Sequence, residues 1–183
     1  QKMFKWKNKK NDNKKYVANY FFIAEKLISK YKPDSIITMQ FFQRKENAIL
    51  CGINEALDFL KKNTNTKKYK IKYLPEGSKI KSLEPVLELE GHYKEFGIFE
   101  GVIDGILARS TSVATNAWEC IQAAKGKEII YMGDRADHYI NQEIDAVHSS
   151  CSSFYLYYFP HFELPVSLFY VHILDRNSIP MEG

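Results

Sequence analysis

Residues 84–116 read EPVLELEGHYKEFGIFEGVIDGILARSTSVATN, and this stretch decides the fold class of the chain. Its first part alternates leucine with glutamate, which predicts a strand over residues 86–90 with one buried face, ended by Gly91. From Phe96 to Ala124 apolar residues recur at helical spacing, which predicts one long helix with Gly126 as its cap. A strand followed by a helix of this length indicates a fold that mixes both kinds of element. The helix also carries a glycine at every fourth position, which favours close packing of another element against it; these are Gly97, Gly101 and Gly105.

The same periodicities predict four elements upstream of this stretch. Apolar residues at helical spacing indicate helices over residues 16–31 and 46–62. β-Branched and aromatic residues indicate strands over residues 36–42 and 69–73, and the sequence PEGS at 75–78 is typical of a turn.

Composition is that of an ordinary globular protein. The 183 residues are 45% hydrophobic and 26% charged, and no apolar run approaches the roughly 20 residues that a membrane-spanning helix needs. The basic N-terminus has no apolar run after it, so it does not resemble a secretory signal. Three cysteines lie far apart with no CxxC pair, which argues against a disulfide framework or zinc ribbon and indicates a cytoplasmic location.

Charge is distributed unevenly along the chain. Residues 1–15 hold seven lysines and one acid and read as a basic, flexible lead-in, and residues 61–81 hold eight lysines and one acid. Residues 143–183 contain no lysine and no glycine before Gly183. We interpret this last segment as a divergent tail, which is either the altered end of a truncated or frameshifted gene or an unusual short variant. The net charge of +4 is too small by itself to indicate nucleic-acid binding.

Two segments are candidates for chemistry. The loop GDRADH at 133–138 follows a predicted strand over 128–132, and ligands bind at the carboxyl ends of such strands. Arg135 suits a carboxylate or phosphate; the alternative is a local ion pair that caps the next helix. The hydroxyl-rich residues 109–116 indicate either a helix break or ligand contact, or hydroxyls bonded back to the helix's own carbonyls.

Several common motifs are absent from the sequence. It contains no GxGxxG, no P-loop, no HExxH and no GxSxG. His148 and Cys151 form a lone HxxC, with no further ligands in the sequence pattern to complete a metal set. The lysine runs have few aromatic residues among them, so RNA binding is only weakly indicated.

A succession of motifs in order resembles nicotinate phosphoribosyltransferase, in the shorter form found in bacteria and archaea. The motifs are YLPEGSKI (73–80), the stretch 84–116 and IIYMGDRADH (129–138). The resemblance extends upstream through KYVANYFFIAEKL and MQFFQRKENAILCGINEALDFL and covers residues 16–142. Quinolinate and nicotinamide phosphoribosyltransferases share the fold and are the nearest alternatives.

The resemblance implies an α+β fold. Residues 16–125 would form an N-terminal open-faced α/β sandwich, called hammerhead-like, and residues 126–142 would begin an irregular α/β barrel that stays incomplete. The lead-in 1–15 precedes these domains and the tail 143–183 follows them.

The activity implied is the joining of nicotinate to phosphoribosyl pyrophosphate, which gives nicotinate mononucleotide in NAD salvage. ATP and Mg²⁺ are the cofactors that the family implies. Family members are usually homodimers in which the N-terminal domain covers the partner's barrel, with no expected binding to nucleic acid or membrane. We expect a truncated form with weak or no activity. The alternative is a non-catalytic basic module that retains the fold and binds nucleic acid or a protein.

The resemblance assigns substrate-binding roles to particular positions. An early aromatic pair would stack on the pyridine ring, the arginine and histidine of the 133–138 loop would face an anionic group, and two threonines would lie near the site. A second arginine that the family often has is replaced by Ala136, and the family's catalytic histidine is not matched. The six residues are Tyr20, Phe21, Thr111, Thr115, Arg135 and His138.

Overall fold

The computed structural model describes residues 13–127 together with His138, Asn141, Ile144, Asp145 and His148. Within this part, a three-stranded antiparallel sheet has the order β1-β5-β3, and a second, two-stranded sheet pairs β2 with β4. The strands are β1 (Ile36–Phe41), β2 (Ala48–Ile49), β3 (Lys70–Tyr73), β4 (Lys79–Ile80) and β5 (Leu87–His92). The helices are α1 (Asn19–Tyr31), α2 (Ile53–Asn63), α3 (Tyr93–Phe96) and α4 (Glu100–Ala124), and the 3₁₀ turns are η1 (Asn13–Tyr16), η2 (Thr66–Lys68) and η3 (Gly97–Phe99).

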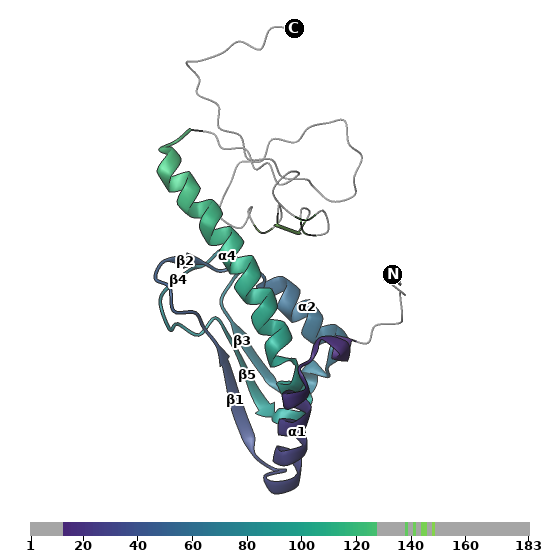
Figure 1. Cartoon of the computed structure of the whole chain (residues 1–183). Coiled ribbons are helices and arrows are strands. Elements are labelled where there is room, and N and C mark those ends of the chain that lie inside the picture. Colours follow the sequence, from purple (N-terminus) through teal and green to yellow (C-terminus); the bar gives the residue numbers. More distant parts are fainter. Residues whose placement is uncertain (1–12, 128–137, 139–140, 142–143, 146–147, 149–183) are drawn as a thin grey trace, which may run out of the picture.

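One face of the three-stranded sheet packs against the helices, as Figure 1 shows. The central strand β5 turns Leu87 and Leu89 into the core, where both are fully buried. They meet apolar side chains from all three long helices, namely Phe21, Ile53, Leu60, Ile103 and Leu107.

The opposite face of the sheet is polar. Gln40 donates a 2.5 Å hydrogen bond to Glu88, and Lys70 forms a 2.7 Å ion pair with Glu90. The antiparallel register places these residues directly opposite each other, so each cross-strand pair is polar. A sheet with one covered and one polar face is an open-faced sandwich, and the predicted α+β class is confirmed.

The helix predicted over residues 46–62 begins only at Ile53. Ala48 and Ile49 instead form β2, paired with Ile80 and Lys79. The backbone takes a left-handed conformation at Asn47 (φ 60°) and at Gly52 (φ 93°), which excludes a continuous helix through this segment. The apolar periodicity was misleading because Ile49 is buried as part of a strand.

The strand predicted to end at Gly91 continues to His92. Gly91 pairs with Ile37 in the ladder, and a Cβ built at this position would lie 2.6 Å from Cβ of Tyr69. The glycine therefore permits close packing within the strand and does not terminate it.

The predicted long helix begins at Glu100, after the short elements α3 and η3. At its C-terminal end, Lys125 (φ 49°) and Gly126 (φ 85°) are both left-handed, so the cap falls one residue before the predicted glycine. The predicted strand over 128–132 lies outside the described residues. Within the described residues, no helix combines the length and apolar character needed to cross a membrane.

Two of the three periodic glycines lie where a larger residue would collide. A Cβ at Gly97 would lie 2.5 Å from the ring of Tyr93, and one at Gly101 would lie 3.0 Å from the ring of Phe21. A Cβ at Gly105 would meet nothing within 4 Å. The prediction of close packing along this side of the helix is therefore confirmed at Gly101 and is wrong at Gly105, while Gly97 lies in η3, before the helix begins.

Replacing Gly52 by alanine is expected to destabilise the domain by about 2–4 kcal/mol. The new Cβ would lie 2.7 Å from Oγ of Ser110 and 3.2 Å from the carbonyl oxygen of Ile106, on a backbone already at positive φ. Gly105→Ala is the matched control. It adds the same methyl group in open space on α4 and is expected to stabilise by about 0.5–1 kcal/mol. Urea unfolding measures both, and a Gly52→Ala variant as stable as the control would contradict the close approach.

Candidate functional site

Two threonine side chains in the middle of α4 face the segment that leads into α2. Thr115 Oγ1 accepts a hydrogen bond of 3.0 Å from the backbone N–H of Ile49. Thr111 Oγ1 accepts one of 3.2 Å from the N–H of Cys51 and donates one of 3.1 Å to its carbonyl. The helix is unbroken here, and the threonines bond to another segment instead of to the helix's own carbonyls. They fix the path of residues 49–51 against α4.

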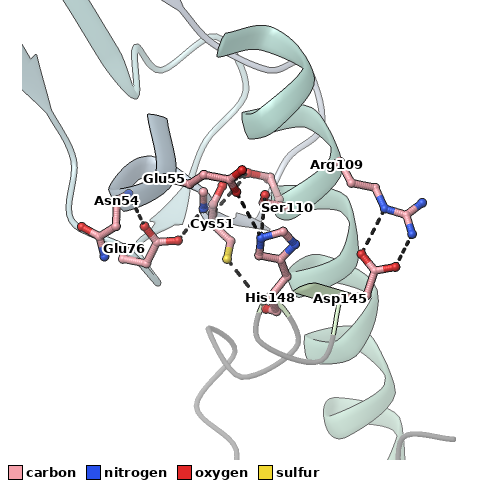
Figure 2. A network of polar contacts seen from close by, with 10 residues as sticks. Cys51, Asn54, Glu55, Glu76, Arg109, Ser110, Asp145 and His148 are labelled. Carbon is pink, nitrogen blue, oxygen red and sulfur yellow. Dashed lines mark hydrogen bonds and ion pairs between the residues drawn. The ribbon is translucent and has the colours of Figure 1, made fainter. Parts of the chain in front are cut away.

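The N-terminus of α2 receives a carboxylate from a distant turn. The N–H groups of Gly52 and Asn54 both donate to the carboxylate of Glu76, the second over 2.9 Å (Figure 2). The N-cap residue of α2 is a glycine with no side chain to fill this role, and an anion suits the positive end of the helix dipole. Glu76 lies in the predicted 75–78 turn. Its partner Gly52 is 24 residues away in the chain, so no local sequence motif predicts the contact.

Two residues from further along the chain dock on the same part of α4. Arg109 donates from Nε to Oδ1 of Asp145 over 3.2 Å and from Nη2 to Oδ2, and Asp145 is almost fully buried. His148 Nε2 lies 3.0 Å from Ser110 Oγ and 3.7 Å from a carboxylate oxygen of Glu55. These contacts hold Asp145 and His148 against α4 and α2 (Figure 2).

The imidazole of His148 is buried, and its Nδ1 has no hydrogen-bond partner among the residues that the structure describes. The sequence singled out this histidine only as half of a weak HxxC motif. Nothing in the sequence pattern predicts its contact with Ser110. Within the described residues, no group of three or more His, Cys, Asp or Glu side chains is arranged to hold a metal ion.

A pocket of about 450 Å³ lies along α4. One wall is a stripe of α4 residues from Asp104 to Asn116, and the other is formed by the end of β1 and the residues after it. The floor is apolar. The residues around it are Phe41, Phe42, Gln43, Lys45, Ala48, Leu50, Ile80, Val86, Asp104, Leu107, Ala108, Thr111, Ser112, Thr115 and Asn116.

Charged groups lie at both ends of this pocket. At one end, Lys45 forms a 2.5 Å ion pair with Glu119. At the other end lies Asp104. Neighbouring protein atoms displace part of the water around its carboxylate, and this raises the pKa of Asp104. The same effect, followed by the charge of Asp104, raises the pKa of Glu100 one turn earlier. A pocket with an apolar floor and polar ends suits the binding of a small amphipathic molecule.

The structure separates the predicted site residues into groups. Thr111 and Thr115 lie together in the pocket wall, while Tyr20 and Phe21 lie on α1 and do not line it. Phe21 is buried in the core beside Gly101, whereas Tyr20 is 61% exposed, with the two rings 4.0 Å apart. The described residue His138 is exposed, and its carbonyl accepts a hydrogen bond from the N–H of Asn141. Arg135 lies outside the described residues.

Comparison with known proteins identifies relatives of this fold. A family model described as quinolinate phosphoribosyl transferase, N-terminal domain, matches residues 20–111. No individual curated protein matches the sequence. The matched range begins in α1, includes every described strand and ends in the middle of α4, so it covers the open-faced sandwich.

Solved structures with a similar fold include the following three proteins. Nicotinate-nucleotide pyrophosphorylase from Pyrococcus furiosus is 24% identical with a TM-score of 0.69, over 81% of this chain and 40% of that one. Human nicotinic acid phosphoribosyltransferase is 15% identical with a TM-score of 0.66, over 76% and 35%. Nicotinate-nucleotide pyrophosphorylase from Ehrlichia chaffeensis is 13% identical with a TM-score of 0.54, over 74% and 53%. At these identities the likeness establishes the fold, and the match spans well under two thirds of each relative's length.

Replacing Thr115 by valine is expected to destabilise the domain by about 1–3 kcal/mol. Valine keeps the shape of this buried side chain but removes the acceptor for the N–H of Ile49, which is itself buried. Ser112→Ala is the control, because Ser112 lines the same pocket from an exposed position and should change stability by no more than about 0.5 kcal/mol. Equal stabilities of the two variants in urea would show that the threonine hydroxyl does not hold segment 49–51.

Proposed function

Because the chain belongs to the family described as quinolinate phosphoribosyl transferase, N-terminal domain, we propose that it acts in transfer of a phosphoribosyl group to a pyridine carboxylate. The observation that carries the proposal is the match of this family model to residues 20–111, the same residues that form the sheet and the first half of α4. In that reaction the pyridine nitrogen bonds to C1 of phosphoribosyl pyrophosphate while the bond from C1 to pyrophosphate breaks. The protein has to orient the ring and stabilise the departing anion.

The substrate that we favour is nicotinate, on the resemblance of the motif succession over residues 16–142. Quinolinate is equally consistent with the family match, since the matching model carries that name while two of the similar structures are named for the nicotinate nucleotide. Both molecules are flat pyridine rings with a carboxylate at C3; quinolinate has a second carboxylate at C2, which would leave as CO₂ when nicotinate mononucleotide forms. The proposal therefore rests on the shared pyridine carboxylate, and direct comparison of the two compounds decides between them.

Tyr20 is the residue of α1 that we propose for ring stacking. Its side chain is 61% exposed, while its neighbour Phe21 is only 4% exposed and is held in the core. An exposed ring on the outside of the domain is available to a second subunit, which supports the homodimer that the resemblance implies. In such a dimer, Tyr20 of one subunit would cover the pyridine site of the other. The ring of Phe21, whose centroid lies 4.0 Å from that of Tyr20, would hold the Tyr20 ring in place.

Magnesium and ATP remain implied by the resemblance alone. Among the residues that the structure describes, no group of three or more His, Cys, Asp or Glu side chains is arranged to hold a metal ion. We therefore assign no residue of the described part to either cofactor.

We expect the 183-residue chain to be a weak catalyst on its own. A cradle of backbone N–H groups around a phosphate needs glycine for close approach, and residues 143–182 contain none. Clamping of the pyrophosphate would then be poor, and a misplacement of about 1 Å costs roughly a hundredfold in rate. For this reason the test of function is ligand binding, with nicotinate mononucleotide formation as a second measurement.

Calorimetric titration with nicotinate, quinolinate, nicotinamide and phosphoribosyl pyrophosphate tests the proposal and the role of Arg135. We expect the chain to bind at least one pyridine carboxylate more tightly than nicotinamide. Arg135→Ala should weaken that binding, or that of phosphoribosyl pyrophosphate, by about 1.5–3 kcal/mol through loss of a charge-assisted pair. Arg44→Ala, an exposed arginine that does not line the pocket, is the control for charge. Absence of binding by all four compounds would contradict the proposed function.

Replacing Tyr20 by alanine is expected to weaken pyridine binding about fivefold or more, because an aromatic stacking contact is lost. Tyr31→Ala is the matched control, since Tyr31 is 68% exposed at the other end of α1. Mixing Tyr20→Ala with Arg135→Ala subunits should restore one intact site per dimer if Tyr20 acts in the partner. Equal binding by wild type and Tyr20→Ala would remove Tyr20 from the site.

A further inference from the structure

Six exposed lysines from three segments gather at the C-terminal end of α2. A 3.0 Å hydrogen bond from Asn13 Nδ2 to Asn63 Oδ1 holds η1 beside the last turn of α2. The turn η2 follows α2 directly in the chain. Figure 1 shows the first coloured segment of the chain beside α2. We call this surface the lysine cluster; its members are Lys14, Lys15, Lys61, Lys62, Lys67 and Lys68.

Most of the positive charge in the lysine cluster is not neutralised. Lys61 pairs with Asp58 and Lys68 with Glu95, each over 3.3 Å. Within the described part of the chain, the other four lysines have no carboxylate within 4 Å of their ammonium groups. The lysines on the polar face of the sheet differ, since Lys70 and Lys72 face Glu90 and Glu88 at 2.7 and 3.9 Å.

Neutral side chains bond to two carbonyls near the C-terminal end of α2. The carbonyl of Phe59 accepts a 2.7 Å hydrogen bond from Asn63 Nδ2, and that of Leu60 accepts one of the same length from Thr64 Oγ1. The backbone N–H of Thr64 also donates to Leu60 over 2.9 Å. All six lysines of the cluster are exposed to solvent. A concentration of free ammonium groups is a site for a polyanion.

We propose that the lysine cluster binds single-stranded nucleic acid through its phosphate backbone, without sequence preference. Lysine is a compact charge on a flexible stem, which suits phosphates at variable positions. Tyr16 is 60% exposed beside the cluster, with Lys15 Nζ 4.7 Å from its ring centroid, and offers a face on which a base can stack. This binding is separate from phosphoribosyl transfer and involves different residues.

Fluorescence anisotropy with the full chain and a labelled oligouridylate of about 15 nucleotides tests the proposal. We expect log K to fall linearly with log salt between about 50 and 200 mM, with a slope of about −0.7 for each phosphate contacted. The triple variant Lys14→Gln, Lys62→Gln, Lys67→Gln removes three unpaired charges. The slope should become shallower by about 2, and affinity at the lowest salt should fall at least about tenfold. Tyr16→Ala should lose roughly fivefold or more at every salt concentration.

The control is a second triple variant with the same change in net charge, Lys70→Gln, Lys72→Gln, Lys79→Gln. Lys70 and Lys72 lie on the polar face of the sheet, and Lys79 lies over the ring of Trp118. Circular dichroism establishes that each variant is folded. A loss in the control equal to that in the cluster variant would overturn the proposal, because net charge alone would then explain binding. So would salt-independent binding, or tighter binding to anionic phosphatidylserine vesicles or to a polyglutamate peptide than to the oligonucleotide.

Discussion

Helix α4 approaches the segment 49–52 so closely that the position at the crossing has to be glycine. Ser110 occupies the space where a side chain at residue 52 would lie, and the backbone there has a φ of 93°. On either side of this contact, Thr111 and Thr115 bond to the backbone of Cys51 and Ile49. Steric fit and hydrogen bonding thus act at one place, and together they fix where α2 starts.

The remaining features of the domain follow from this crossing. Once segment 49–52 is held against α4, the N-terminus of α2 faces the 75–78 turn, where Glu76 accepts its first N–H groups. On the same turn of α4, Arg109 binds Asp145 and Ser110 contacts His148. On its neighbouring side, α4 forms the wall of the pocket that ends at Asp104 and Asn116. One helix therefore contacts the segment before α2, forms a wall of the pocket and binds Asp145 and His148.

The division between Tyr20 and Phe21 shows how adjacent residues with similar side chains acquire different roles. Both are aromatic, and the helical periodicity of α1 includes both of them. Only one can face the sheet, because successive residues on a helix are about 100° apart. Phe21 packs beside Gly101 and contributes to stability, while Tyr20 faces outward and is free for recognition. The exposed lysines at the end of α2 illustrate the same principle, since folding places six of them together and, within the described part of the chain, only Lys61 and Lys68 pair with a carboxylate.

The sequence by itself determined the elements whose pattern is local. Alternation over residues 86–90 and helical spacing over 96–124 predicted the central strand and the main body of α4, because burial of one face imposes these periods directly. The strand at Ala48–Ile49, the role of Glu76 and the pairing of Arg109 with Asp145 could not be predicted this way. Each depends on a partner far away in the chain, and no local periodicity records such a contact. The tertiary structure alone decided whether a hydroxyl, a glycine or a lysine contributes to packing or remains available for binding, because that depends on which atoms folding brings within a few ångströms.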